Sequence, residues 1–249
     1  MTAPAGSTET PSEWTSAWEV QQRFMQHSLP AVVSLNHSAQ CRQVDAIGGD
    51  FYDFVPLADH RLAIVVGDAS GKGLPAALMA SNVHSSLRTA SLFVDNDGPA
   101  ALNAVNRQVY ESSLENRYAT LFYAVFANAT RTLRYVNAGH HPPMIIQGDG
   151  TILWLETGGA PLGMFPDWKY EEGAVEFCPG DLMLAYTDGV VEAANPNGEE
   201  WGIEGLQNAA AECDSQSPAG IVQAIFAAMD DFTHGRQTDD ATVLVLRAD

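Results

Sequence analysis

Four aspartates share one kind of local sequence: each stands at the end of an apolar segment, beside glycine, a second acid or a small residue. They are Asp50 in Gly-Gly-Asp-Phe-Tyr, Asp68 in Val-Gly-Asp-Ala-Ser, Asp188 in Tyr-Thr-Asp-Gly-Val and Asp239 in Thr-Asp-Asp-Ala-Thr. A carboxylate at the end of a buried strand costs free energy unless a cation or several hydrogen bonds compensate its charge. If these four meet in the fold, they predict a metal site.

Carboxylate ligands without histidine or thiolate partners favour Mg²⁺ or Mn²⁺ over zinc or copper. Two such ions about 3.5 to 4 Å apart would turn a bridging water into a nucleophile and neutralise charge on a phosphoryl group. The chemistry is hydrolysis of a phosphate ester without a covalent intermediate. Any one of the aspartates, taken alone, is more typical of a turn or a cap. The hypothesis therefore rests on all four together.

The segment between Gly67 and Gly73 superficially resembles a nucleotide-binding P-loop, but three residues separate its first two glycines and Gly73 replaces the required hydroxyl. Its Lys72 either lies near the substrate or is an exposed turn lysine. Glu192 follows Asp188 by four residues and would share a helical face with it, either to tune the site or to cap a turn.

His140 and His141 are adjacent, so on extended backbone they point to opposite sides and do not easily share one ion. A turn-stabilising role before the two prolines that follow is favoured. Three cysteines, Cys41, Cys178 and Cys213, give neither a disulfide framework nor a zinc ribbon. For a thiol phosphatase, Cys41 beside Arg42 is only a weak candidate.

The elements that must position these residues follow an α+β order. Residues 1–13 are predicted to be a disordered leader, residues 14–28 a linker or regulatory helix, and residues 29–249 one domain. The apolar segment Leu62–Val66 predicts a central strand. A meander of antiparallel strands is expected from Ala119 to Leu155. The other predicted elements are helices at Leu74–Leu92, Pro99–Leu114, Ile203–Ala211 and Ala219–Phe232, and strands near Tyr170–Glu176, Leu182–Tyr186 and Ala241–Arg247.

Composition excludes several classes of partner. The chain has 249 residues, 46% of them hydrophobic, and a formal net charge of −19. This charge repels nucleic acid and anionic lipid. No apolar run approaches the roughly 18 residues of a membrane span, and the N-terminus lacks the order of a signal peptide. We expect a cytoplasmic protein that binds neither nucleic acid nor membrane.

Five motifs, in this order along the chain, resemble those of the bacterial SpoIIE/RsbU branch of the type 2C metal-dependent serine/threonine protein phosphatases. They are Gly48-Gly-Asp-Phe-Tyr-Asp53, Gly67-Asp-Ala-Ser-Gly-Lys-Gly-Leu-Pro-Ala-Ala-Leu78, Asn137-Ala-Gly-His-His-Pro-Pro143, Thr187-Asp-Gly-Val-Val-Glu192 and Asp239-Asp-Ala-Thr242. Each motif is weak alone, but together they are highly specific and cover roughly residues 20–247.

The resemblance implies a four-layer α-β-β-α fold: a β-sandwich of two mainly antiparallel sheets flanked by helices, with a site for two Mn²⁺ or Mg²⁺ ions at one edge. Asp68 would bridge both ions and Ala69 would lend its backbone carbonyl to one. Asp188 and Asp239 would hold the other, and Asp50 would complete the cluster directly or through water. Arg42 is the candidate for binding the substrate phosphate.

The family acts on phosphoserine or phosphothreonine of anti-sigma factor antagonists, so such a phosphoprotein is the partner that the resemblance implies. The helix at residues 14–28 is similar to the family's linker helix and could also form a homodimer. Two alternatives stay open: a non-catalytic, phosphatase-like module that binds a regulatory protein, and a hydrolase of small phosphoesters.

Overall fold

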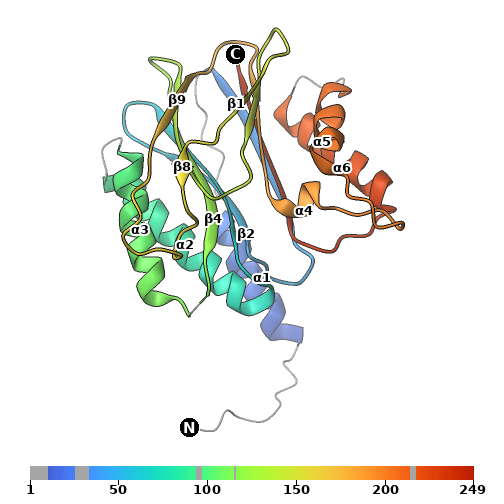
Figure 1. Cartoon of the computed structure of the whole chain (residues 1–249). Helices are drawn as coiled ribbons and strands as arrows, with labels where there is room; N and C mark the ends of the chain where they lie inside the picture. Colours follow the sequence, from blue (N-terminus) through green and yellow to red (C-terminus); the bar gives the residue numbers. More distant parts are fainter. Residues whose placement is uncertain (1–10, 26–33, 94–96, 115, 214–216) are drawn as a thin grey trace.

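The computed structural model describes residues 11–25, 34–93, 97–114, 116–213 and 217–249. Two β-sheets pack face to face, and helices cover the outer face of each (Figure 1). This is the four-layer α-β-β-α sandwich expected from the resemblance, and the prediction is confirmed. In these ranges no helix combines the length and the apolar character that crossing a membrane requires.

The first sheet has the strand order β2-β3-β4-β5-β8. Its central strand β3 carries the buried, β-branched run predicted at residues 62–66, as a strand flanked on both sides should. β9 extends the sheet by pairing with β5. The strands are β2 (Asp50–Pro56), β3 (Arg61–Ala69), β4 (Ala119–Ala127), β5 (Thr132–Ala138), β8 (Gly158–Gly159) and β9 (Gly173–Glu176).

The second sheet has the strand order β1-β11-β10-β6-β7. The last strand of the chain, β11, is an internal strand of this sheet and pairs with β1 and β10. The strands are β1 (Leu35–Arg42), β6 (Met144–Ile146), β7 (Ile152–Trp154), β10 (Leu182–Tyr186) and β11 (Ala241–Ala248). The predicted single meander from residue 119 to residue 155 is therefore wrong: β4 and β5 belong to one sheet and β6 and β7 to the other. Period-2 patterns locate strands but do not say which sheet they join.

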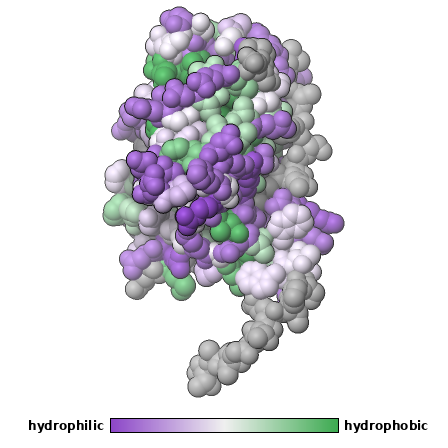
Figure 2. All heavy atoms as spheres, turned by 90° about the vertical axis from the view of Figure 1, so that its right-hand side faces the viewer, coloured by the Kyte–Doolittle hydropathy of each residue, from purple (hydrophilic) through white to green (hydrophobic). Residues whose placement is uncertain are grey.

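Helices α2 (Gly73–Phe93) and α3 (Gly98–Ser112) pack on the first sheet, and α5 (Gly202–Ala211) and α6 (Pro218–Thr233) on the second. Local signals set their ends: the Asp97 side chain accepts the N–H of Ala100 at the start of α3, and Ser217 caps α6 before Pro218. Figure 2 shows the face that lies at the right in Figure 1, where hydrophilic residues predominate.

Three hydrophobic cores hold the four layers together. One lies between α2, α3 and the first sheet, one between the sheets, and one between the second sheet and α5 and α6. Phe122 and Phe126 fill the middle core without exposure to solvent. Complete cores on both faces of each sheet leave the strand ends as the place where charged side chains can gather.

Helix α1 runs from Pro11 to Met25, so it begins three residues earlier than predicted. Residues 1–10 and 26–33 lie outside the described ranges, and with them most of the predicted leader. Among the side chains of this helix whose burial is described, residues 13–23, Gln21 is the buried one, whereas Trp18 and Val20 are 45% and 53% exposed. The Gln21 amide donates to the Gly48 carbonyl at 2.7 Å, and the Gly48 N–H donates back to Gln21 Oε1 at 3.2 Å. The helix is thereby fastened to the segment that precedes Asp50.

Candidate functional site

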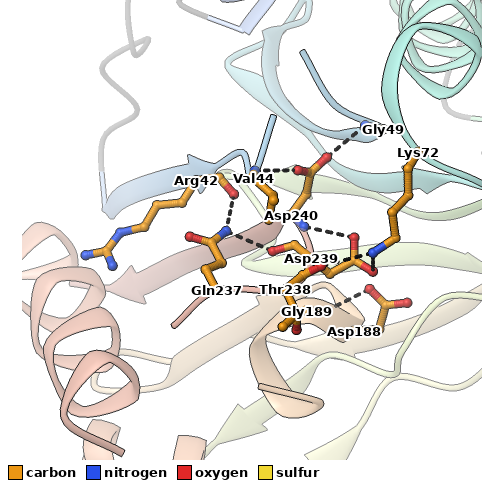
Figure 3. A network of polar contacts seen from close by, with 10 residues as sticks. All are labelled: Arg42, Val44, Gly49, Lys72, Asp188, Gly189, Gln237, Thr238, Asp239 and Asp240. Carbon is orange, nitrogen blue, oxygen red and sulfur yellow. Dashed lines mark hydrogen bonds and ion pairs between the residues drawn. The ribbon is translucent and has the colours of Figure 1, made fainter. Parts of the chain in front are cut away.

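The structure brings the four sequence-predicted aspartates to one end of the sandwich. Asp50 begins β2 and lies opposite Asp68 in the β2–β3 register. Asp188 is the first residue of α4 (Asp188–Val191), directly after β10. Asp239 lies two residues before β11, and Figure 3 shows it beside Asp188. Both sheets therefore contribute acids to the same end.

Asp50 is deeply buried, with 1% of its surface exposed. The hydroxyl groups of Thr187 and Thr242, at the ends of two strands of the opposite sheet, donate to its Oδ2 at 2.6 and 2.7 Å. The N–H of Thr242 donates to Thr187 Oγ1 at 2.9 Å, which turns that hydroxyl towards Asp50. Burial and the charge of Asp68 raise the pKa of Asp50 well above its ordinary value. The two hydroxyls hold the carboxylate without neutralising it.

Asp68 has the most informative electrostatics of the four. Burial raises its pKa, and the charges of Asp188, Asp239 and Asp240 raise it further, to about 7. Such a shift means that several carboxylates lie close enough to oppose one another's ionisation. A cation bound among them would reverse this effect, because it stabilises the ionised forms.

Glycines allow the chain segments to approach this closely. A Cβ atom on Gly49 would lie 2.7 Å from the carbonyl oxygen of Ala69 and 3.2 Å from Asp68 Oδ1. On Gly189 it would lie 1.9 Å from the carbonyl oxygen of Asp240. Any larger residue at these positions would push the acidic loops apart. The same contact places the Ala69 carbonyl beside the carboxylates.

Asp239 is engaged on both of its oxygens. Lys72 Nζ donates to Asp239 Oδ2 at 2.7 Å and to the Thr238 carbonyl at 3.0 Å, while the N–H of Asp240 donates to Asp239 Oδ1 at 3.0 Å (Figure 3). The hydrogen bond from Lys72 to Asp239 raises the pKa of the lysine. Lys72 thus lies at the acidic cluster, with 63% of its side chain exposed. Its ammonium group is therefore a cation that a phosphorylated substrate could contact at the cluster.

Asp240 is a site residue that the sequence reasoning missed. Its carboxylate accepts the backbone N–H groups of Val44 and Gly49, both at 2.9 Å, and so ties the start of β11 to the segment before Asp50 (Figure 3). Burial raises its pKa, which its hydrogen bonds lower in part. The only signal was the Asp239-Asp240 doublet, of which the first member was chosen.

Arg42, the predicted phosphate-binding residue, has other partners. Its Nη1 donates to both oxygens of Asp230 on α6 at 2.9 and 2.8 Å, and the guanidinium lies 4.1 Å from the centre of the Phe226 ring. Figure 3 shows the side chain directed away from Lys72 and Asp188. In this conformation Arg42 anchors α6 to β1, and its assignment to substrate phosphate gains no support.

Asp53 is a second acid whose environment the sequence did not reveal. It is 2% exposed, and its Oδ2 lies 2.9 Å from His84 Nε2 and 2.5 Å from Arg88 Nη1, both on α2. Burial alone would raise its pKa, but the hydrogen bonds and charges of His84 and Arg88 outweigh burial and lower it. Asp53 is therefore an ionised carboxylate whose charge is compensated by two side chains of α2, and it joins β2 to α2.

The remaining candidates have structural surroundings. His140 is 5% exposed, its Nδ1 lies 2.9 Å from Thr120 Oγ1, and burial lowers its pKa to about 3, so the imidazole is neutral. The backbone N–H of His140 donates to Asn137 Oδ1 at 2.8 Å, and this hydrogen bond closes the turn as predicted. Glu192 is exposed and follows the helical turn that begins at Asp188. Burial raises the pKa of Cys41 well above its usual value, so its thiol stays protonated.

The donor set fits a hard divalent ion, since it consists of carboxylates and one backbone carbonyl and contains no thiolate or imidazole. Asp50, Asp68, Asp188, Asp239 and Ala69 are the residues that could hold such an ion. As the side chains stand, no three acidic, imidazole or thiolate groups of the described residues already have ligand spacing. Asp239 would have to exchange Lys72 or the Asp240 N–H for the ion.

Comparison with known proteins agrees with the geometry. The family model for stage II sporulation protein E (SpoIIE) matches residues 58–249. Phosphoserine phosphatase RsbU of Bacillus subtilis is 30% identical over 241 residues, which are 96% of this chain and 71% of RsbU. Protein IcfG of Synechocystis is 30% identical over 214 residues, which are 76% of this chain but only 34% of IcfG. The chain thus spans about a third of the length of that relative.

A solved structure shares the fold over nearly its whole length. The SiaA-PP2C domain of Pseudomonas aeruginosa superimposes with a TM-score of 0.82 at 23% identity and covers 96% of each chain. Matching motifs, a matching family model and a matching fold lead to one conclusion. The chain belongs to the SpoIIE/RsbU-type family of protein serine/threonine phosphatases.

Proposed function

We propose that the chain is a metal-dependent protein serine/threonine phosphatase that acts on a phosphorylated anti-sigma factor antagonist. The observation that carries this proposal is the group of carboxylates around Asp68, where burial and the charges of Asp188, Asp239 and Asp240 raise the pKa of Asp68 to about 7. Similarity to a phosphoserine phosphatase supports the reaction type. Because such antagonists control transcription, the reaction would take place in the cytoplasm.

The residues of this chain have distinct tasks in the proposed reaction. Asp68, Asp188 and Asp239 bind the divalent ions, with the Ala69 carbonyl beside them, and the threonine hydroxyls keep Asp50 pointed at Asp68. When bound, two such ions supply an activated water and neutralise charge on the phosphoryl group. Lys72 would move from Asp239 towards the negatively charged substrate. The protonated Cys41 thiol is not a nucleophile for a covalent route.

We further propose that α1 is a regulatory helix, with a homodimer through its exposed face as one arrangement. Its hydrogen bonds with Gly48 connect it to the segment that carries Asp50, so a shift of the helix would move that segment. Trp18 and Val20 remain exposed for a partner.

The test of the proposed reaction is incubation of the purified protein with a phosphorylated anti-sigma factor antagonist in Mn²⁺ and in EDTA. Phosphate release that requires Mn²⁺ is the expected result. Binding of the phosphoprotein without hydrolysis would instead identify a non-catalytic module. Hydrolysis of p-nitrophenyl phosphate without release from the phosphoprotein would identify a hydrolase of small phosphoesters.

A further inference from the structure

The turn between α3 and β4 is fastened to the loop that carries the central aspartate. The N–H of Ser70, two residues after Asp68, donates to the Tyr118 carbonyl at 2.9 Å, and the N–H of Tyr118 donates to Ser70 Oγ at 3.1 Å. Arg117 Nη1 donates to the Ser70 carbonyl at 2.7 Å. In Figure 1, α3 leads into β4 at the end of the sandwich where α4 also lies. This turn is therefore a neighbour of the candidate metal site.

A cavity of about 600 Å³ opens on this turn, lined among others by Tyr110, Leu114, Arg117, Tyr118 and Met164. We call it the Leu114 groove. A second hollow of about 350 Å³ shares Leu114 and Arg117 with it and continues onto the first turns of α2. The two hollows adjoin at Leu114 and Arg117, beside Ser70.

The side chains of the Leu114 groove are unusually apolar for a free surface. Leu114 is 78% exposed, Tyr110 48%, Met164 38% and Tyr118 36%. Large exposed apolar side chains that gather around a hollow mark a site of interaction.

The charge of the described lining residues is uncommon for this chain. The chain as a whole has a formal net charge of −19, yet the lining residues within the described ranges include an arginine and no acid; Glu115, between Leu114 and Asn116, lies outside those ranges. Within the described ranges, the hydrogen bond to the Ser70 carbonyl is the contact recorded for the Arg117 guanidinium. The other N–H groups of this side chain are available to an anionic partner.

We propose that the Leu114 groove binds the segment of the phosphoprotein substrate next to its phosphorylated residue. An apolar side chain of that segment packs on Leu114, Tyr110 and Met164, and an acidic side chain meets Arg117. The proposal rests on the proposed phosphatase function and names the surface that distinguishes a protein substrate from a small phosphoester. The hydrogen bonds to Ser70 place the groove beside the loop that carries Asp68, which favours the substrate as its occupant over a second copy of the chain, and Arg117 suits an acidic side chain of that substrate.

The test compares Leu114→Glu with Leu92→Glu, a matched control at an exposed position near the far end of α2. Both substitutions replace exposed leucine, so neither should unfold the protein. The rates measured in Mn²⁺ are kcat/KM for a phosphorylated anti-sigma factor antagonist and for p-nitrophenyl phosphate. Leu114→Glu should lower the first about tenfold, mainly through KM, and leave the second unchanged. Leu92→Glu should change neither.

The Arg117→Gln variant is a second, independent test of the groove proposal, because glutamine keeps a hydrogen-bond donor for the Ser70 carbonyl but removes the positive charge. Added salt should lower kcat/KM for the phosphoprotein less in this variant than in the wild type.

Three outcomes would overturn the groove proposal: unchanged phosphoprotein kinetics in Leu114→Glu, an equal loss with both substrates, or a change of oligomeric state in that variant. If the wild-type protein releases no phosphate from the antagonist, the proposed function is overturned as well. This outcome is seen before any variant is made, so it is distinguished from a failure of the groove proposal alone.

Discussion

Asp50 and Asp53 are two buried carboxylates three residues apart on one strand, and the protein treats them in opposite ways. Asp53 faces α2, where Arg88 and His84 neutralise it and lower its pKa. Asp50 faces the other sheet, where burial and the charge of Asp68 raise its pKa well above normal, and the hydrogen bonds from Thr187 and Thr242 offset only part of that rise. A buried acid with a cationic partner is part of the framework. A buried acid without one marks the place where an external cation is needed.

The largest effect is expected from Asp68→Asn, because it removes the carboxylate that lies at the centre of the uncompensated group. Turnover of the phosphorylated antagonist in saturating Mn²⁺ should fall about 100-fold or more, with the fold retained. Asp59→Asn, at an exposed turn, is the control and should keep wild-type turnover. Wild-type rates in Asp68→Asn would refute the assignment of this residue.

Asp53→Asn should reduce the free energy of unfolding by about 2 to 3 kcal/mol, because Arg88 and His84 lose the charge that they surround. The expected value is at the lower end for a buried ion pair, since 30% of the Arg88 side chain is exposed. Denaturant unfolding measures the change. Turnover per folded molecule should remain near that of the wild type, and a loss of turnover as large as that of Asp68→Asn would erase the distinction between the two acids.

The pH dependence of stability separates the two kinds of acid. In EDTA, the unfolded chain ionises Asp68 at its ordinary pKa, whereas the folded protein holds this proton up to about pH 7. The contribution of Asp68 to the free energy of unfolding therefore falls as the pH rises from about 4 through 7. Asp53 has the opposite sign, because the stability from its lowered pKa is lost only when the pH falls through that pKa.

Asp68→Asn should consequently be more stable than the wild type at pH 8 by about 2 kcal/mol in EDTA, and by less at pH 5. This value is roughly half of what the pKa shift alone would give, because the Asp68 side chain keeps some contact with water. Denaturant unfolding of both proteins at the two pH values measures the difference. A difference that is the same at pH 5 and pH 8 would contradict the raised pKa.

The smallest effect is expected from Asp50→Asn. Its amide oxygen can still accept the hydroxyls of Thr187 and Thr242, while the opposed charge is gone, so stability in EDTA at pH 8 should rise by about 1 kcal/mol. The same substitution three residues away, at Asp53, should lower stability. If both variants lose stability equally, the two carboxylates do not differ in the way that their surroundings indicate.

The order of the five motifs predicted the four-layer fold, and placed Asp50, Asp68, Asp188 and Asp239 at one edge of it, through the resemblance to the family; the apolar strand ends alone did not establish that the four meet. The sequence could not assign strands to sheets, since a period-2 pattern does not name its partner. Nor could the sequence show that Arg42 binds Asp230 of α6, because the two residues are 188 positions apart in the chain. Asp240 was missed because two adjacent aspartates cannot be told apart in the sequence. Only the structure shows that the backbone N–H groups of Val44 and Gly49 donate to Asp240.

The central claim is that the carboxylates grouped around Asp68 bind divalent ions. A crystal structure of the protein in Mn²⁺, with anomalous differences recorded at the manganese edge, tests it most directly. The account predicts manganese peaks in contact with Asp68, Asp188 and Asp239, and their loss in Asp68→Asn. Mn²⁺-dependent turnover in crystals or solution together with no peak beside these carboxylates would contradict it.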